Sequence, residues 1–200
     1  MTLEHENFPQ TELLPDGRSV VVREMTISDE PRMVEFFQSL PLEDRNFLRN
    51  DVSKPDVVHR FVRETEDLVL ALVAEANGRI IASATIERGL YGWTRHIGEV
   101  RLVVGRPWQR HGLAKVLLRH LVRAAPGAGL ELIKGYVAGG KVGAQKALEA
   151  MGFKKEAILR RHVKDVAGRR RDLLIYTNDV SHIWEKMEAL NADFSPTQGE

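Results

Sequence analysis

A phosphate-binding turn is the first chemistry that the sequence indicates, in the stretch Gln109-Arg110-His111-Gly112-Leu113-Ala114. Backbone N–H groups at the start of a helix lack partners within the helix and carry the positive end of its dipole. A pyrophosphate can meet several of these donors if the backbone comes close, which requires small residues such as Gly112 and Ala114. The pattern is short, and the alternative interpretation is a tight strand-to-helix turn in which His111 is an ordinary surface histidine.

The elements around this stretch have the order that such a turn needs. An apolar strand is predicted over residues 97–104, and an amphipathic helix over 112–125 follows the turn. A second strand is predicted over 131–138, and a helix over 141–153 then leads to two strands at 153–163 and 169–178. The turn therefore lies inside a β-α-β unit.

The first half of the chain predicts a strand within residues 14–25, short helices, and a β-hairpin. Two β-rich runs, at 68–75 and 79–87, flank Asn77-Gly78, which is the strongest short hairpin signal. Hairpins followed by a β-α-β unit indicate a mixed α/β sheet and not a doubly wound dinucleotide fold. The chain also lacks G-x-G-x-x-G and a Walker P-loop.

Length and composition favour one ordinary globular domain. We assign it to residues 14–190 of the 200, with loose ends at 1–13 and 191–200. The balance of 29 basic and 28 acidic residues argues against a nucleic-acid partner. The longest apolar run has seven residues, too few to cross a bilayer, so we expect a cytoplasmic protein without a membrane partner. The chain has no cysteine and its histidines show no metal spacing, so no metal is expected.

With these motifs in place, the sequence resembles the GCN5-related N-acetyltransferase (GNAT) superfamily over roughly residues 14–176. The resemblance is carried by E-V-R-L-V-V-G-R-P-W-Q-R-H-G-L-A at 99–114 and by A-L-E-A-M-G-F at 147–153. The opening L-P-D-G-R-S-V-V-V-R looks most like the catalytic domains of bacterial protein-lysine acetyltransferases. The resemblance implies a mixed, mostly antiparallel sheet of six to seven strands, flanked by helices, with a splay between the fourth and fifth strands.

The resemblance also implies a binding site for acetyl-CoA. In the family, backbone amides of the turn hold the pyrophosphate, and the preceding strand pairs with the pantetheine arm as an added strand would. Carried over to this chain, the coenzyme-binding residues are Leu102, Val103, Val104, Gln109, Arg110, His111, Gly112, Leu113, Ala114, Lys115 and Lys141. Lys141 stands where the family often has an asparagine.

Acid–base residues are the weakest part of the resemblance. Glu99, five residues before Val104, matches a glutamate that often serves as general base, although a salt bridge to Arg101 is the structural alternative. The tyrosine that commonly protonates the CoA thiolate is replaced by Leu148. Tyr136 is a weak substitute for it, and the alternative interpretation of Tyr136 is a core tyrosine.

The implied function is an acetyl-CoA-dependent N-acetyltransferase of the EC 2.3.1 class. Without cysteine a thiol acyl-enzyme is impossible, which favours direct attack of a primary amine in a ternary complex. The acceptor could be a protein lysine, a protein N-terminus or a small molecule, and a homodimer is an open alternative. A second hypothesis is a catalytically weakened acyl-CoA-binding sensor or regulatory module.

Overall fold

The computed structural model describes residues 8–46, 48, 50–63, 68–89 and 91–180. The strands are β1 (Gln10–Leu13), β2 (Ser19–Glu24), β3 (Leu68–Ala76), β4 (Arg79–Arg88), β5 (Ile97–Val104), β6 (Leu132–Ala138), β7 (Lys154–Lys164) and β8 (Arg170–Asp179). The α-helices are α1 (Glu30–Ser39), α2 (Leu42–Arg45), α3 (Pro55–Arg63), α4 (Leu113–Ala124) and α5 (Val142–Ala150). Short 3-10 turns at Ile27–Asp29, Arg106–Trp108 and Pro126–Ala128 join some of them.

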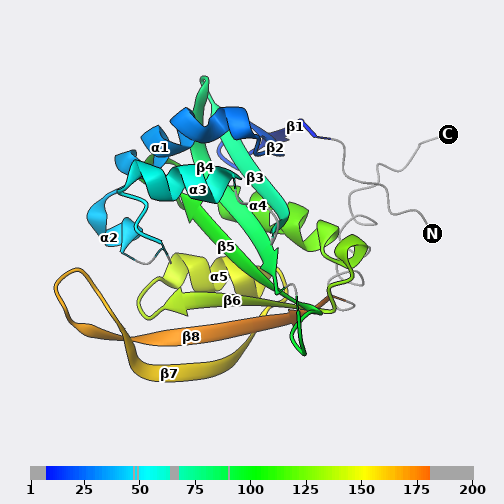
Figure 1. Ribbon diagram of the computed structural model, residues 1–200, viewed down its shortest axis with the longest axis vertical. Coiled ribbons are helices and arrows are strands. Elements are labelled where there is room, and N and C mark those ends of the chain that lie inside the picture. The colour runs from blue at the N-terminus through cyan, green and yellow to red at the C-terminus, as the bar shows by residue number, and fades with distance from the viewer. Residues whose placement is uncertain (1–7, 47, 49, 64–67, 90, 181–200) are drawn as a thin grey trace.

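One mixed sheet organises these elements, with the strand order β1-β2-β3-β4-β5-β6-β8-β7 (Figure 1). Among the described strands, β5 and β6 form a parallel pair and the other neighbours are antiparallel. The predicted hairpin is confirmed, since Asn77 and Gly78 both have positive φ (51° and 74°), as its two-residue turn requires. The mixed, mostly antiparallel sheet predicted from sequence is therefore present.

The sheet has eight strands where the sequence predicted six to seven. The additional strand is β1, in a segment that the sequence analysis assigned to a loose end. It pairs with β2 through a tight turn in which Leu14 N–H donates to Arg18 O at 2.8 Å. Glu12 of β1 also accepts a 2.7 Å hydrogen bond from Arg119 of α4. These long-range contacts order a segment that is locally polar and aperiodic. Residues 1–7, the last ten residues of the domain assigned to 14–190, and the loose end at 191–200 lie outside the described part of the chain.

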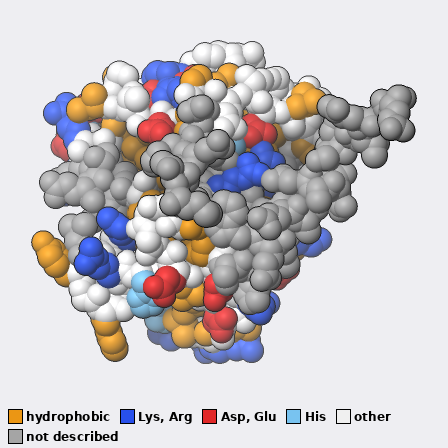
Figure 2. All heavy atoms as spheres, turned by 90° about the vertical axis from the view of Figure 1, so that its right-hand side faces the viewer, with side chains coloured by type: hydrophobic (Ala, Val, Ile, Leu, Met, Phe, Trp, Pro, Cys, Tyr) orange, Lys and Arg blue, Asp and Glu red, His pale blue; other side chains and the backbone are white. Residues whose placement is uncertain are grey.

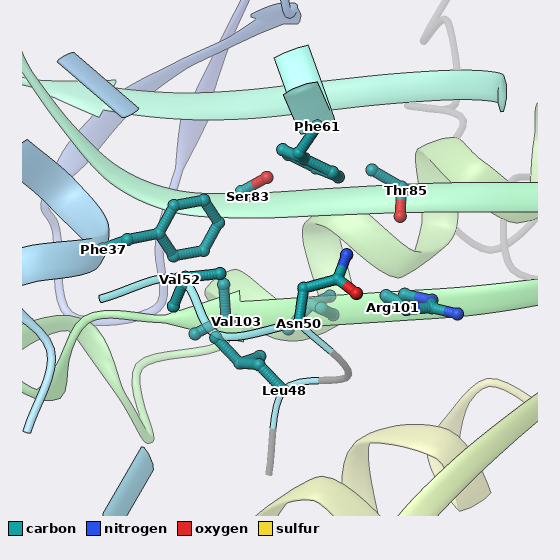
Figure 3. Close-up of a pocket in the computed structure, with 10 residues that line it drawn as sticks. Phe37, Leu48, Asn50, Val52, Phe61, Ser83, Thr85, Arg101 and Val103 are labelled. Carbon is teal, nitrogen blue, oxygen red and sulfur yellow. The ribbon is translucent and has the colours of Figure 1, made fainter. Parts of the chain in front are cut away.

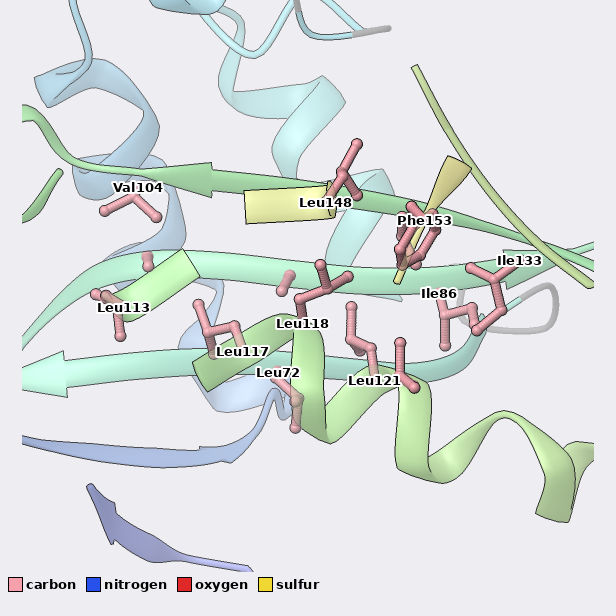
Figure 4. Close-up of a cluster of buried hydrophobic side chains, with 14 of the residues drawn as sticks. Leu72, Ile86, Val104, Leu113, Leu117, Leu118, Leu121, Ile133, Leu148 and Phe153 are labelled. Atoms are coloured by element: carbon pink, nitrogen blue, oxygen red, sulfur yellow. The ribbon is translucent and has the colours of Figure 1, made fainter. Parts of the chain in front are cut away.

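Hydrophobic side chains form one cluster on each face of the sheet. On one face α4 buries Leu113, Leu117 and Leu121 against the strands, and Leu148 of α5 and Phe153 join the same cluster (Figure 4). On the other face α1 and α3 cover β3 and β4, with Phe37 and Val62 among the buried side chains. Helices therefore cover the sheet on both faces.

The outer surface mixes charges of both signs. On the face shown in Figure 2, basic and acidic side chains are interspersed over the described residues. Among the helices of those residues, none combines the length and apolar character that crossing a bilayer requires.

Candidate functional site

The two parallel strands at the centre of the sheet separate after a short paired stretch. β5 and β6 pair from Ile97 with Leu132 to Val100 with Gly135, and the pairing then stops. Beyond that point β5 continues beside β4 as far as Val104, while β6 continues beside β8. Residues 101–104 therefore present an open strand edge toward β6. The predicted binding residues Leu102, Val103 and Val104 all lie on it, and such an edge can accept an extended ligand as a further strand.

The predicted phosphate turn connects this edge to α4. Gly112 is the N-cap of α4 with φ 87°, and Arg110 also has a positive φ of 67°. Among the described residues, the backbone N–H groups of 110–114 have no hydrogen-bond acceptor. A Cβ at Gly112 would lie 3.0 Å from Cδ of Pro15. The turn is thus tightly packed from behind and keeps its donors free, which is what binding of a diphosphate requires.

Several side chains of the predicted turn are engaged within the protein. Gln109 Nε2 donates to Val104 O at 2.9 Å, and His111 Nδ1 lies 2.8 Å from Asp16 Oδ2. Leu113 is fully buried in the core, so only its N–H group can serve a ligand. Arg110 and Lys115 are exposed and could reach an anion. The turn offers a ligand its backbone more than its side chains.

Lys141 lies across the opening from this turn, at the N-cap of α5. Its Nζ is 2.8 Å from Oδ1 of Asp44, and Arg106 Nε donates to the other oxygen of Asp44 at 3.0 Å. Burial acts to raise the pKa of Asp44, but the hydrogen bonds from Lys141 and Arg106 outweigh it and hold the pKa below its ordinary value. We call this arrangement the Asp44 bridge. It joins the end of β5, through Arg106, to the end of β6, through Lys141.

Glu99, the predicted base, lies in a row of charges across the three central strands. It pairs in register with Glu87 of β4 and with Lys134 of β6. Arg101 NH2 lies 3.0 Å from Glu99 and 3.2 Å from Glu87, and Lys134 Nζ lies 3.5 Å from Glu99. The Glu99 side chain is 23% exposed. The salt bridge to Arg101 is therefore present, and the Glu99 carboxylate, which lies between two cations, keeps part of its surface exposed.

A pocket adjoins this row of charges on the face covered by α1 and α3 (Figure 3). Its floor is made by Ser83 and Thr85 of β4 with Arg101 and Val103 of β5, and Phe37 and Phe61 form its walls. Leu48, Asn50 and Val52 close it from the segment after α2, and Leu102 also lines it. Sequence analysis missed this pocket. The available signal was the polar alternation of Ser83, Thr85 and Glu87 in an otherwise apolar strand.

Leu148, at the position of the family's usual acid, and Tyr136, the possible substitute, have different surroundings. Leu148 is buried in the core beside Gly135. Tyr136 is 44% exposed, and Lys134 Nζ lies 5.6 Å from the centre of its ring. Tyr136 is therefore not the core tyrosine that the sequence allowed as an alternative.

Comparison with known proteins identifies the family. The model of the acetyltransferase (GNAT) family matches residues 31–153. The chain belongs to the GNAT acetyltransferase family, as its sequence motifs predicted. Comparison with curated proteins gives no match.

Solved structures agree with this assignment at the level of the fold. A GNAT-family acetyltransferase from Streptococcus pneumoniae is 22% identical with a TM-score of 0.70, covering 80% of this chain and 99% of that one. The GNAT domain of S. lividans PAT is 24% identical with a TM-score of 0.69, covering 86% and 96%. The yncA structure from Salmonella typhimurium, solved with its cofactor acetyl-CoA, is 18% identical with a TM-score of 0.70, covering 80% and 94%.

Proposed function

We propose that the protein transfers the acetyl group of acetyl-CoA to a primary amine by direct attack in a ternary complex. The observation that carries this proposal is the continuity of one path. It begins at the unpartnered N–H groups of residues 110–114, follows the open edge of β5, and ends beside Glu99 and the pocket. A diphosphate held at one end would direct the thioester along this edge toward the other.

The chemistry needs a neutral amine at that end. An alkylamine with a pKa near 10.4 is almost wholly protonated at neutral pH, so a nearby carboxylate must take its proton, directly or through water. We assign this role to Glu99. The amine nitrogen then forms a C–N bond with the acetyl carbonyl carbon, the nitrogen loses its second proton to water, and the C–S bond breaks. A main-chain N–H near Val103 or Val104 would stabilise the oxyanion. The thiolate of CoA takes a proton from solvent, since Leu148 offers none.

A second candidate function, an acyl-CoA-binding module that transfers poorly, is favoured by two observations. Leu148 is buried where the family often places its acid, and Glu99 is shared between Arg101 and Lys134. Both candidates require the same binding of the coenzyme and differ only in turnover.

One experiment separates them. Calorimetric titration with CoA should show saturable binding, and acetyl-CoA mixed with a panel of amines should release free CoA thiol. Binding without thiol release from any amine would establish the binding module instead. No binding of CoA would refute both candidates.

A further inference from the structure

The pocket on the α1/α3 face contains polar groups that the fold leaves without partners. Thr85 is 2% exposed, and its hydroxyl has no hydrogen-bond partner among the described residues. The same holds for Nε of Arg101, a buried atom, although NH2 of that side chain is paired. Leaving a buried polar group unpaired costs about 1–3 kcal/mol. These two groups therefore indicate a ligand that offers an oxygen.

Thr85 and Arg101 are direct partners in the β4–β5 register, so both groups lie at one point of the floor. Figure 3 shows the Thr85 oxygen directed toward the β5 side of the pocket, where Arg101 lies. A carbonyl or carboxylate oxygen placed there could accept hydrogen bonds from the hydroxyl and from Nε–H together.

The walls next to this polar floor are apolar. Phe37 and Phe61 meet edge to face with their ring centres 6.1 Å apart, and Val52 is buried against them. A branched or aromatic side chain of moderate size would be shielded from water between these residues. The pocket thus combines an apolar wall with a site for one oxygen.

The pocket also lies beside the proposed reacting atoms. Glu99 is two residues from Arg101 on the same face of β5, roughly 6–7 Å along the strand. The open edge of β5 begins at Arg101. A molecule in the pocket can therefore have its amine next to Glu99 if amine and oxygen are only a few bonds apart.

We propose that the acceptor is the α-amine of an amino-acyl unit with an apolar side chain. The side chain would lie against Phe37 and Phe61, and the carbonyl oxygen would accept from Thr85 and Arg101. This proposal rests on the proposed function and names its acceptor class. A lysine side chain or an alkylamine would bring methylene groups to the floor and leave both donors unpaired. A polyamine would also bring further positive charge beside Arg101 and Lys134.

The test compares leucine amide with 3-methylbutylamine, which has the same side chain and amine but no carbonyl group. Rates of CoA thiol release are expressed per neutral amine, because α-amines have a pKa near 8 and alkylamines a higher one. We expect kcat/KM for leucine amide to exceed that for 3-methylbutylamine by on the order of tenfold or more. Nα-acetyl-lysine amide and spermidine should be as poor as 3-methylbutylamine.

Variants connect this preference to the pocket. Thr85→Val removes the hydroxyl at nearly constant shape and should abolish the preference, whereas Thr85→Ser keeps the hydroxyl and should retain it. Thr177→Val on β8 is the matched control, because Thr177 has a partner in Glu156 and does not line the pocket. CoA affinity should be the same in all of these variants.

Binding is measured in parallel, so that the result does not depend on turnover. Calorimetry with CoA-saturated protein should show leucine amide binding on the order of tenfold tighter than 3-methylbutylamine, and only Thr85→Val should remove the difference. Equal rates or affinities for the two amines, no binding of either, or an unchanged preference in Thr85→Val would overturn the proposal. Those outcomes leave CoA binding intact, whereas failure of the proposed function removes CoA binding or all thiol release.

Free leucine and a leucine-initiated tripeptide then distinguish a small-molecule source from a peptide.

Discussion

At the scale of single residues, Gly112 gives the sharpest prediction for coenzyme binding. Its φ of 87° disfavours any residue with a Cβ, and that Cβ would lie 3.0 Å from Pro15. Gly112→Ala should therefore shift the turn and weaken CoA binding on the order of tenfold, as measured by calorimetry. Gly168→Ala is the control, because φ is 73° there and the space around it is open. Gly168→Ala should lower folding stability by about 1 kcal/mol, and Gly112→Ala by somewhat more because its Cβ also meets Pro15. Equal CoA affinity in the two would contradict the assignment of the turn.

Glu99 is the residue on which the proposed chemistry depends. Glu99→Gln should lower kcat at neutral pH on the order of a hundredfold, because no carboxylate then takes the proton of the amine. CoA affinity should change little. Glu87→Gln is the matched control, since Glu87 pairs with the same guanidinium from the neighbouring strand. Similar losses in the two variants would show that the charge row matters and that Glu99 is not the base.

At the scale of elements, α2 connects two strands that diverge. Asp44 links Arg106, after β5, to Lys141, after β6, and its side chain is only 12% exposed. The Asp44 carboxylate thus neutralises two cations, Arg106 and Lys141, that lie next to the opening between β5 and β6. A coenzyme that carries phosphates would compete with Asp44 for both.

Asp44→Asn should therefore strengthen CoA binding by about two- to fivefold in low salt, measured by calorimetry, and less at high ionic strength. Glu43→Gln also removes one negative charge, but the ion pair of Glu43 within the described residues is with Arg106, and Glu43 is 58% exposed. It should have a smaller effect. Weaker CoA binding in Asp44→Asn would mean that the bridge positions these cations for the ligand.

At the scale of the whole molecule, ion pairs with low exposure connect the start of α1 to strands β2 and β3. Asp29, 2% exposed, accepts hydrogen bonds from Arg23 of β2 at 2.5 and 2.6 Å. Arg23 also pairs with Glu75 of β3. The hydrogen bonds from Arg23 outweigh the opposing effect of burial and lower the pKa of Asp29 from 3.8 to about 2.

This shift sets how folding stability depends on pH. Because the folded-state pKa is the lower one, the contribution is complete above about pH 4 and is lost as the pH falls toward 2. Asp29→Asn should lower the free energy of unfolding by about 2 kcal/mol at pH 7, measured with urea, and by less at pH 3. Exposed Asp56 is the control, and Asp56→Asn should change stability by less than about 0.5 kcal/mol. If the loss of unfolding free energy in Asp29→Asn were the same at pH 7 and pH 3, it would not come from the lowered pKa of Asp29.

Local pattern predicted much of the fold, including the tight turn at residues 109–114 that begins α4. Asn77-Gly78 fixes a hairpin by its own backbone preference, and Gly112 marks the head of α4 for the same reason. What local pattern could not predict depends on partners far away in the chain. β1 forms because its strand pairs with β2 and Glu12 reaches α4. The Asp44 bridge joins residues 62 and 97 positions apart.

The pocket was missed for a related reason. Thr85 and Arg101 become a joint site only through the β4–β5 register, and their walls come from α1 and α3. From the sequence alone Thr85 is one polar residue in an apolar run. Its lack of a partner becomes visible only when every neighbour has been placed.

The turn between β1 and β2 packs directly against the predicted phosphate turn. Pro15 abuts Gly112, Asp16 holds His111, and the guanidinium of Arg18 lies 4.3 Å above the ring of Trp108. A ligand that immobilises residues 109–114 should therefore also reduce local opening of the β1–β2 hairpin. Amide protons of residues 10–24 would then exchange with deuterium more slowly in the presence of CoA.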